Sequence, residues 1–373
     1  MEKKEIYKYL LFILFFIAIC CNCCLFVSCE KRGHNDIETL VFDVSDDSSV
    51  PLSDIADNII KIGLETADEC LLKDVRQVEI FENYLLVKDI SPFLYVFDME
   101  GKFIRRIGTV GNGPGEYTLC TRFFLDEQNK KIFLKTNVGT FLYDIKGIFL
   151  EKHPLRQSKG SITSIFYDND FFYLFNYVFF NENTDFYQDI YFEVYDKSLN
   201  IVDSLLMHRY KTGFKREIYS GIRKPIFRNG EDIYVYYPRS DVDEKKVKDT
   251  LYIVDNFRLC PFLDIRLSNS QKDDRINYIF TTTRYTIVNY STWIQEGTSS
   301  VFKIYSSQCV YDCKTKKSRH AKDGFTDDRY NNDHVIISPM FKQDMFYYIK
   351  EEEYSEELGA EPNPTIYIGK FKE

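Results

Sequence analysis

The feature that most constrains the fold is a recurring pattern of strand end, tight turn and strand start. Its clearest copies are Val96–Phe103 (Val-Phe-Asp-Met-Glu-Gly-Lys-Phe) and Leu142–Phe149 (Leu-Tyr-Asp-Ile-Lys-Gly-Ile-Phe). Weaker copies centre on Asp196, Asp255 and Asp312. Counted from Asp98, the successive aspartates are 46, 52, 59 and 57 residues apart, and a sixth copy without the aspartate follows at 366–369. A supersecondary unit repeated at such a period indicates a propeller or another repeat fold.

The aspartate and glycine of each copy predict a hairpin. An aspartate carboxylate can accept backbone N–H bonds from residues just ahead of it, and glycine takes a positive φ at no steric cost. Two further strand-like runs precede the hairpin in several units: 122–126 with 131–135, 161–167 with 171–176, and 224–228 with 232–237. Four short strands per unit of about 50 residues predict an all-β, six-bladed β-propeller with four antiparallel strands per blade. Aromatic residues make up 16% of the chain, which also favours strands.

The two ends of the chain are expected to meet in the last blade. The sixth unit reaches Glu373 directly after its third strand. The run Ile37–Phe42 is strand-like and belongs to no other blade. We therefore expect this N-terminal strand to pair with the last blade and close the ring, which would remove two exposed sheet edges.

The first residues have the pattern of an export signal. Lys3, Lys4 and Lys8 precede an apolar run from Leu10 to Val27, and Phe26–Cys29 resembles a bacterial lipobox. We predict a lipoprotein signal peptide at 1–28, a lipidated tether at 29–36 with the lipid on Cys29, and the propeller domain at 37–373. The expected location is the cell envelope, on the outer membrane, at either its periplasmic or its surface side. The alternative is an uncleaved transmembrane anchor, which also exports the body.

Composition and motif searches exclude several classes of function. The formal net charge is -9 with no basic cluster, which argues against nucleic acid as a partner. Outside the leader and Cys29, the cysteines at 70, 120, 260, 309 and 313 form no CxxC pair, and the five histidines show no metal-site spacing. We expect no metal and no cofactor. The glycine-rich run 111–115 is interpreted as a turn between blades, since no Lys-Ser/Thr follows it.

The chain resembles the six-bladed β-propeller lipoproteins of Bacteroidetes, which are related in architecture to NHL-repeat propellers. The residues that carry the resemblance are Ile62–Thr66, Gly101–Gly108 and Gly111–Tyr117. The resemblance implies the fold and the cell-envelope address. It transfers no catalytic residue.

Because successive strands of a blade run in opposite directions, we expect the long connections to lie on one face of the ring. They are 181–189, 238–249, 293–303 and 351–364. Loops on a rigid scaffold commonly carry recognition, although they can also be tolerated insertions. Arg76, Arg122 and Arg223 lie near the starts of innermost strands at this face and could hold a carboxylate or phosphate, or could be isolated surface residues. Tyr187, Trp293 and Tyr354 are candidates for a platform that stacks on sugars.

The sequence therefore predicts a non-enzymatic binding or interaction module tethered to a membrane by its N-terminal lipid. The expected partner is a glycan, a peptide or an envelope protein, bound at the long-loop face. The alternative is an envelope glycan lyase or hydrolase with its site at the pore mouth, where a carboxylate pair would be required. A structural subunit of an envelope complex is the third hypothesis. No catalytic residue is predicted.

Overall fold

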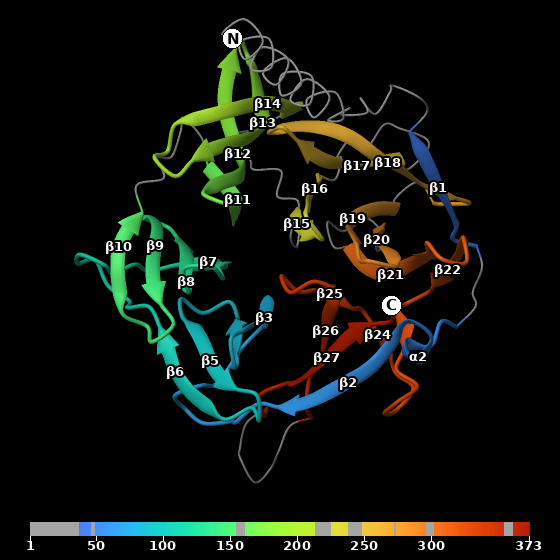
Figure 1. Cartoon of the computed structure of the whole chain (residues 1–373), viewed down its shortest axis with the longest axis horizontal. Helices are drawn as coiled ribbons and strands as arrows, with labels where there is room; N and C mark the ends of the chain where they lie inside the picture. Colours follow the sequence, from blue (N-terminus) through green and yellow to red (C-terminus); the bar gives the residue numbers. More distant parts are fainter. Residues whose placement is uncertain are drawn as a thin grey trace, which may run out of the picture. The chain divides into compact units, whose positions relative to one another are not determined.

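Six antiparallel sheets follow one another along the chain and form a six-bladed β-propeller (Figure 1). The computed structural model describes residues 37–45, 49–153, 161–212, 225–237, 248–271, 274–295, 302–353 and 361–373. The chain divides into two units, Met1–Glu38 and Thr39–Glu373, and only Ile37 and Glu38 of the first are described. The predicted fold class is confirmed.

The first three blades each consist of four strands that are consecutive in the chain. Blade one contains β3 (Gln77–Phe81), β4 (Tyr84–Lys88), β5 (Leu94–Asp98) and β6 (Phe103–Ile107). Blade two contains β7 (Cys120–Asp126), β8 (Lys131–Thr136), β9 (Gly139–Asp144) and β10 (Phe149–His153). Blade three contains β11 (Ser161–Asp168), β12 (Phe171–Glu182), β13 (Asp185–Asp196) and β14 (Ile201–Thr212).

Two of the last three blades, four and six, include a strand from the start of the chain. Blade four contains β15 (Ile226–Asn229), β16 (Asp232–Tyr236), β17 (Lys248–Asp255), β18 (Arg258–Ser268) and, outermost, β1 (Glu38–Asp43). Blade five contains β19 (Asp274–Thr281), β20 (Tyr285–Gln295), β21 (Phe302–Asp312) and β22 (Lys317–Ala321). Blade six contains β25 (Ser338–Pro339), β26 (Met345–Lys350), β27 (Thr365–Phe371) and β2 (Ala56–Gly63).

The repeated aspartates form the turns that the sequence predicts. The Oδ1 atom of Asp98 accepts the N–H groups of Glu100 (3.0 Å) and Lys102 (2.8 Å), and Gly101 has a φ of 87°. Asp144 and Asp196 each accept an N–H four residues ahead, at 2.8 Å. Blade four departs from the pattern, because a two-residue turn with positive φ at Asn256 and Phe257 follows Asp255. In most blades the turn is therefore determined by the residues of the turn itself.

The strand that closes the ring is β2. It pairs antiparallel with β27, and Ile60 lies opposite Ile368. The expectation that Ile37–Phe42 pairs with the last blade is wrong, because β1 is instead the fifth strand of blade four, beside β18 (Figure 1). The physical reason is connectivity: β2 leads directly into blade one, as an outermost strand leads into the next blade elsewhere in the ring. Leu40 and Phe42 of β1 are buried in the apolar core of blades four to six.

The segment between β1 and β2 connects blade four to blade six. It includes the short helix α2 (Leu52–Ile55) and contacts a small hairpin, β23 (Phe325–Thr326) with β24 (His334–Val335). The N–H of Thr326 donates to the carbonyl of Val50 at 2.9 Å, and the N–H of Ser53 donates to Asp328 at 3.0 Å. No helix in the described part of the chain is long and apolar enough to cross a membrane.

Blade three and blade five contain longer strands than the sequence suggests. The predicted loop at 181–189 is wrong, since β12 and β13 are twelve residues each and only Asn183 and Thr184 separate them. The cross-strand pair Phe180 and Tyr187 stacks with ring centroids 5.5 Å apart, and such aromatic pairs stabilise an extended hairpin. In blade five, both ends of the predicted loop at 293–303 are strand, because β20 extends to Gln295 and β21 starts at Phe302, while 296–301 lie outside the described residues.

Candidate functional site

A cavity of about 460 Å³ lies at the centre of the ring. It is lined by residues from five of the six blades, most of them at the starts of innermost strands or in the connections at that end. The polar members include Arg76, Gln77, Asp89, Thr121, Arg122, Ser164 and Ser338, and the apolar members include Ile90, Leu119, Phe124, Ile165, Phe341 and Tyr347. A volume of this size is typical of a small-molecule site.

Phe341 closes the inner end of this central cavity. It follows β25 of blade six, and its N–H donates to the buried Glu79 of blade one at 2.6 Å. Its side chain packs against apolar clusters of blades one to three. The next residues reach blades four and five: Gln343 donates to Asn229 at 3.2 Å and Asp344 accepts the N–H of Thr283 at 2.8 Å. The segment 341–344 therefore crosses the ring at the face that carries the connections between the first and second strands of the blades, and Phe341 lines the cavity at this end.

Arg76 and Arg122 both line the central cavity, from adjacent blades. Arg76 directly precedes β3, and Arg122 lies near the start of β7. Gln77 fixes these two strands to each other, because its side-chain amide donates to the carbonyl of Phe123 at 3.1 Å and accepts the N–H of the same residue at 3.4 Å. The guanidinium of Arg76 also donates to Asp74, and both side chains are about half exposed. The two arginines thus sit on a scaffold that holds them at one cavity.

The third charged residue of the lining, Asp89, is fully engaged by its surroundings. Its carboxylate accepts the N–H of Ser91 at 2.9 Å and the N–H of Lys73 at 3.1 Å. The ammonium of Lys88 lies 3.8 Å from it, and both side chains are fully buried. Burial lowers the pKa of Lys88, whose ammonium donates to the carbonyls of Asp89 and Ser91. This network shapes the cavity wall.

Cys120 lines the same cavity but is not suited to covalent chemistry. Its side chain is buried, and burial raises the pKa of the thiol to about 11. A reactive cysteine needs a lowered pKa and access to solvent. In the described parts of the chain, no three His, Cys, Asp or Glu side chains gather as a metal site would require.

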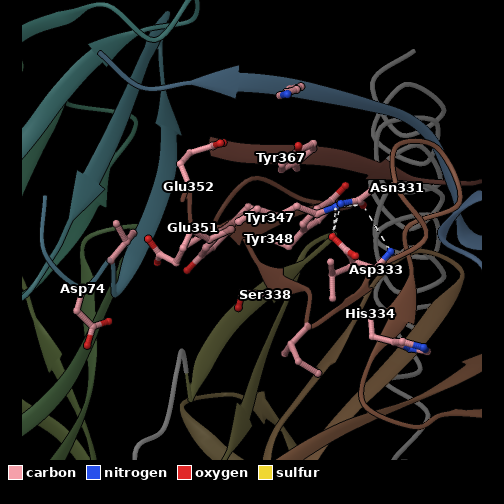
Figure 2. Close-up of a pocket in the computed structure, with 16 residues that line it drawn as sticks. Asp74, Asn331, Asp333, His334, Ser338, Tyr347, Tyr348, Glu351, Glu352 and Tyr367 are labelled. Atoms are coloured by element: carbon pink, nitrogen blue, oxygen red, sulfur yellow. Dashed lines mark hydrogen bonds and ion pairs between the residues drawn. The ribbon is translucent and has the colours of Figure 1, made fainter. Parts of the chain in front are cut away.

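A second cavity, of about 900 Å³, lies over blade six and shares Ser338 and Tyr347 with the central cavity. Figure 2 shows its acidic side chains, Asp74, Asp333, Glu351 and Glu352, around the strand that carries Tyr347 and Tyr348. Burial raises the pKa of Glu351, and repulsion from Asp74 and Glu361 adds to the effect. We call this the blade-six cavity.

Lys350 anchors one wall of the blade-six cavity. Its ammonium donates to the buried Asp327 at 2.6 Å and lies 3.4 Å from Asp333, and it also binds Asn331. The same ammonium lies 5.2 Å from the ring centroid of Tyr367, which stacks on Tyr348 at 4.7 Å. These contacts hold the 327–333 loop against blade six.

Of the other predicted binding residues, the structure describes Tyr187 and Trp293, and these two do not gather with Arg76 and Arg122. Arg223, Tyr354 and the lipidation residue Cys29 lie outside the described residues. Tyr187 lies on β13 and Trp293 on β20, so both are strand residues and the expectation that they are loop residues is wrong. Tyr187 stacks on Phe180, while Trp293 donates to Ser291 at 3.1 Å and has Arg275 over its ring. They belong to different blades, and neither lines a cavity described above.

Sequence reasoning missed several residues that shape the site. Phe341 and Glu79 meet only because blade six lies beside blade one where the ring closes, and nothing in either local sequence indicates it. The pair Lys88 and Asp89 follows an apolar run at a strand end, where charged residues are normally solvated. The sequence offered one signal for these residues, namely a charged residue at the end of an innermost or second strand.

Comparisons with known proteins agree with the fold. The model of a family described as "Domain of unknown function (DUF4934)" matches residues 37–370. A crystal structure from Bacteroides fragilis, of a protein whose name describes it as exported, is similar at a TM-score of 0.62 and 19% identity, covering 90% of this chain and 100% of that one. At this identity the likeness shows the fold alone.

Two further solved structures are less similar. U3-55K has a TM-score of 0.43 at 9% identity, covering 86% of this chain and 99% of that one. The WD40 repeats of RRP9 have a TM-score of 0.43 at 8% identity, covering 87% and 99%. A comparison with curated proteins gave no match.

Proposed function

This chain belongs to the DUF4934 family, and we propose that it is a cell-envelope binding protein that takes a ligand into the central cavity of its propeller. The observation that carries the proposal is the shape and lining of that cavity. It is closed at one end by Phe341, and two arginines from adjacent blades line it. A closed, mostly apolar cup with a few convergent polar groups is the usual form of a ligand site.

The absence of an evident reaction centre supports binding rather than catalysis as the first proposal. Within the described residues, the central cavity combines two arginines, one fully engaged aspartate and a buried, unreactive thiol. None of these forms a nucleophile–base pair of the kind that hydrolytic chemistry requires.

The proposed location is the envelope, with the body tethered by a lipid on Cys29. The leader pattern and the exported description of the Bacteroides fragilis neighbour support export. The test is metabolic labelling with a fatty acid in cells that express the full chain. We expect label in the wild type and none in Cys29→Ala. Equal labelling of both, or none in either, would rule out this lipid anchor.

Binding in the cavity is tested by a screen of glycans, peptides and small envelope metabolites against the body that begins at Ile37. Leu119 lines the cavity mouth and is 47% exposed, so Leu119→Trp should obstruct entry with little effect on folding. Val138 is similarly exposed, at 43%, lies in a connection at the same end of its blade and does not line the cavity, so Val138→Trp is the matched control. We expect hits that Leu119→Trp weakens and Val138→Trp does not. Hits insensitive to both changes would place binding elsewhere and overturn the proposal.

A glycan-active enzyme is the second candidate, and the blade-six cavity is the observation that favours it. Glu351 has a raised pKa and feels the charge of Asp74, as a general acid beside a carboxylate would. The test is turnover of envelope polysaccharides by the body, with Glu351→Gln as the inactivating change. Turnover that survives Glu351→Gln would remove this cavity as the active site.

A further inference from the structure

The charges of the described residues around the central cavity sum to zero. Three cations stand against three carboxylates, namely Arg76, Lys88 and Arg122 against Asp74, Asp89 and Glu79. Arg76 is bonded to Asp74, and the ammonium of Lys88 lies 3.8 Å from Asp89. The carboxylate of Glu79 accepts the N–H of Phe341 at 2.6 Å. A charged ligand would lose its hydration on entry, and this balanced set has no excess of opposite charge to compensate the loss.

The larger part of the cavity wall is apolar. Phe124, Ile165 and Ile226 come from blades two, three and four, and Phe341 and Tyr347 come from blade six. Contact with such a wall favours a ligand that has an apolar body. The volume of about 460 Å³ equals that of about 15 water molecules, so a body of about 10 to 15 non-hydrogen atoms fits the space.

Two apolar side chains of the lining are exposed to solvent. Ile90, between β4 and β5, is 50% exposed, and Leu119, directly before β7, is 47% exposed. They belong to adjacent blades and extend the apolar wall toward the mouth of the cavity. Exposed apolar surface at a ligand site gains free energy when a ligand covers it. Both the wall and the mouth therefore favour an apolar ligand.

One buried hydroxyl in the lining has no hydrogen-bond partner among the described residues. It belongs to Ser164 on β11 of blade three, which is 5% exposed and lines the cavity. The backbone of Ser164 pairs with Phe175 of β12, which leaves the hydroxyl to the cavity. A buried hydroxyl without a partner costs free energy, and a ligand atom that bonds it removes this cost. Because a hydroxyl both donates and accepts, it matches a neutral alcohol or carbonyl group.

We propose that the central cavity binds an uncharged ligand with an apolar body, such as an alcohol, ketone or ester, whose one polar group bonds the hydroxyl of Ser164. This inference rests on the proposed function, because it names the ligand class of that same cavity. It differs from a general binding role in disfavouring both anions and cations and in requiring Ser164.

The first experiment compares three ligands with the same ten-carbon chain: decanol, decanoate and decylamine. Isothermal titration of the body from Ile37 at pH 7 measures each affinity, below the concentration at which the ligands aggregate. We expect decanol to bind at least about 10-fold more tightly than either charged compound. Raising the salt concentration should leave decanol unchanged. Equal or tighter binding of decanoate or decylamine would overturn the assignment.

Chain length tests the apolar wall. From hexanol through octanol to decanol, we expect the affinity to rise about two- to fourfold for each added methylene group, as burial of a growing apolar body requires. Affinities that do not change with chain length would contradict the contact with the wall.

Variants of Ser164 test the polar contact. We expect Ser164→Ala to weaken decanol about 3- to 10-fold, and Ser164→Thr, which keeps the hydroxyl, to retain most of the affinity. Ser204→Ala is the matched control, because Ser204 is exposed on β14 and does not line the cavity. Circular dichroism and thermal unfolding of each variant separate loss of binding from loss of fold. An equal affinity of wild type and a folded Ser164→Ala protein would overturn the role of this hydroxyl.

The outcomes distinguish this inference from the function on which it rests. Tighter binding of a charged compound that Leu119→Trp blocks would overturn the uncharged class alone. Failure of all these compounds, together with other hits that Leu119→Trp blocks, would also overturn it and leave the cavity as the binding site. Hits that are indifferent to Leu119→Trp would refute both.

Discussion

Arg76, at the central cavity, donates a hydrogen bond to Asp74, which lines the neighbouring blade-six cavity. One ion pair thus connects two cavities that also share Ser338 and Tyr347. Because both side chains are about half exposed, the pair contributes little to stability. Its consequence is for charge, because Asp74 neutralises the guanidinium of Arg76 at the boundary between the two cavities.

Asn363 is predicted to be a main contributor to stability at the junction of blades six and one. Its buried side chain accepts the N–H of Leu72 at 2.7 Å and donates to the carbonyls of Glu65 (2.7 Å) and Cys70 (2.8 Å). Asn363→Ala leaves three backbone groups without these partners and should cost about 3 kcal/mol or more in urea unfolding. Asn200→Ala, in an exposed turn, should cost less than about 1 kcal/mol. Similar losses for the two variants would refute the prediction.

Gly101 and Gly147 occupy the same turn position in blades one and two, with φ of 87° and 84°. A Cβ at 101 would lie 2.1 Å from the carbonyl oxygen of Gly63, whereas a Cβ at 147 meets nothing nearer than 3.4 Å. Substitution to Ala at either position should lower the stability by about 1–2 kcal/mol because of the positive φ. Gly101→Ala should cost about 1–3 kcal/mol more, because the backbone of β2 must move. Chemical denaturation of the two variants measures the difference, and equal values would exclude the close approach.

Asp312 is expected to make stability depend on acid pH. Arg284 donates to both of its oxygens, at 3.1 and 2.8 Å, and this contact holds the pKa of Asp312 well below its ordinary value. A depressed pKa contributes stability that is present above the unfolded-state value, about 4, and is lost as the pH falls through the folded-state value. Asp312→Asn should destabilise by about 1–3 kcal/mol at pH 7. The difference from wild type should shrink as unfolding is measured from pH 5 down to pH 2; a constant difference would contradict the assignment.

Truncation should separate the roles of β1 and β2. A chain that begins at Ser49 lacks β1 and loses the burial of Leu40 and Phe42, which costs about 3–6 kcal/mol, yet it keeps the ring closed. A chain that begins at Leu64 also lacks β2 and leaves β27 without its outer partner. We expect the first to unfold cooperatively at a lower midpoint and the second to lack a cooperative transition. A folded chain from Leu64 would show that closure by β2 is dispensable.

The parts of the fold that sequence predicts are those set by local chemistry. Asp98, Asp144 and Asp196 form their turns with residues four or fewer positions ahead, so the turns can be read without knowing the tertiary structure. The two N-terminal strands could not be told apart in this way. Both β1 and β2 are short runs of mixed apolar and polar residues, and only the connection into blade one decides which of them completes the ring.

Only part of the candidate site could be predicted from the sequence. The starts of innermost strands must converge on the ring axis, which is why Arg76 and Arg122 could be placed at one cavity. The closure of that cavity could not be anticipated, because Phe341 acquires its role from Glu79, 262 positions earlier. Tyr187 and Trp293 were assigned to loops because strand length depends on cross-strand packing, such as that of Phe180 on Tyr187.

The pairing of Ile60 with Ile368 spans 308 positions, and this separation has a consequence for biogenesis. Blade six cannot be assembled until the final residues have been synthesised, because its outer strand comes from the beginning of the chain and its inner three from the end. Bringing such distant segments together carries a large loop-closure cost before any contact compensates it. A partly synthesised chain therefore keeps an open sheet edge and stays loosely folded, which is the state that a secretion channel can thread.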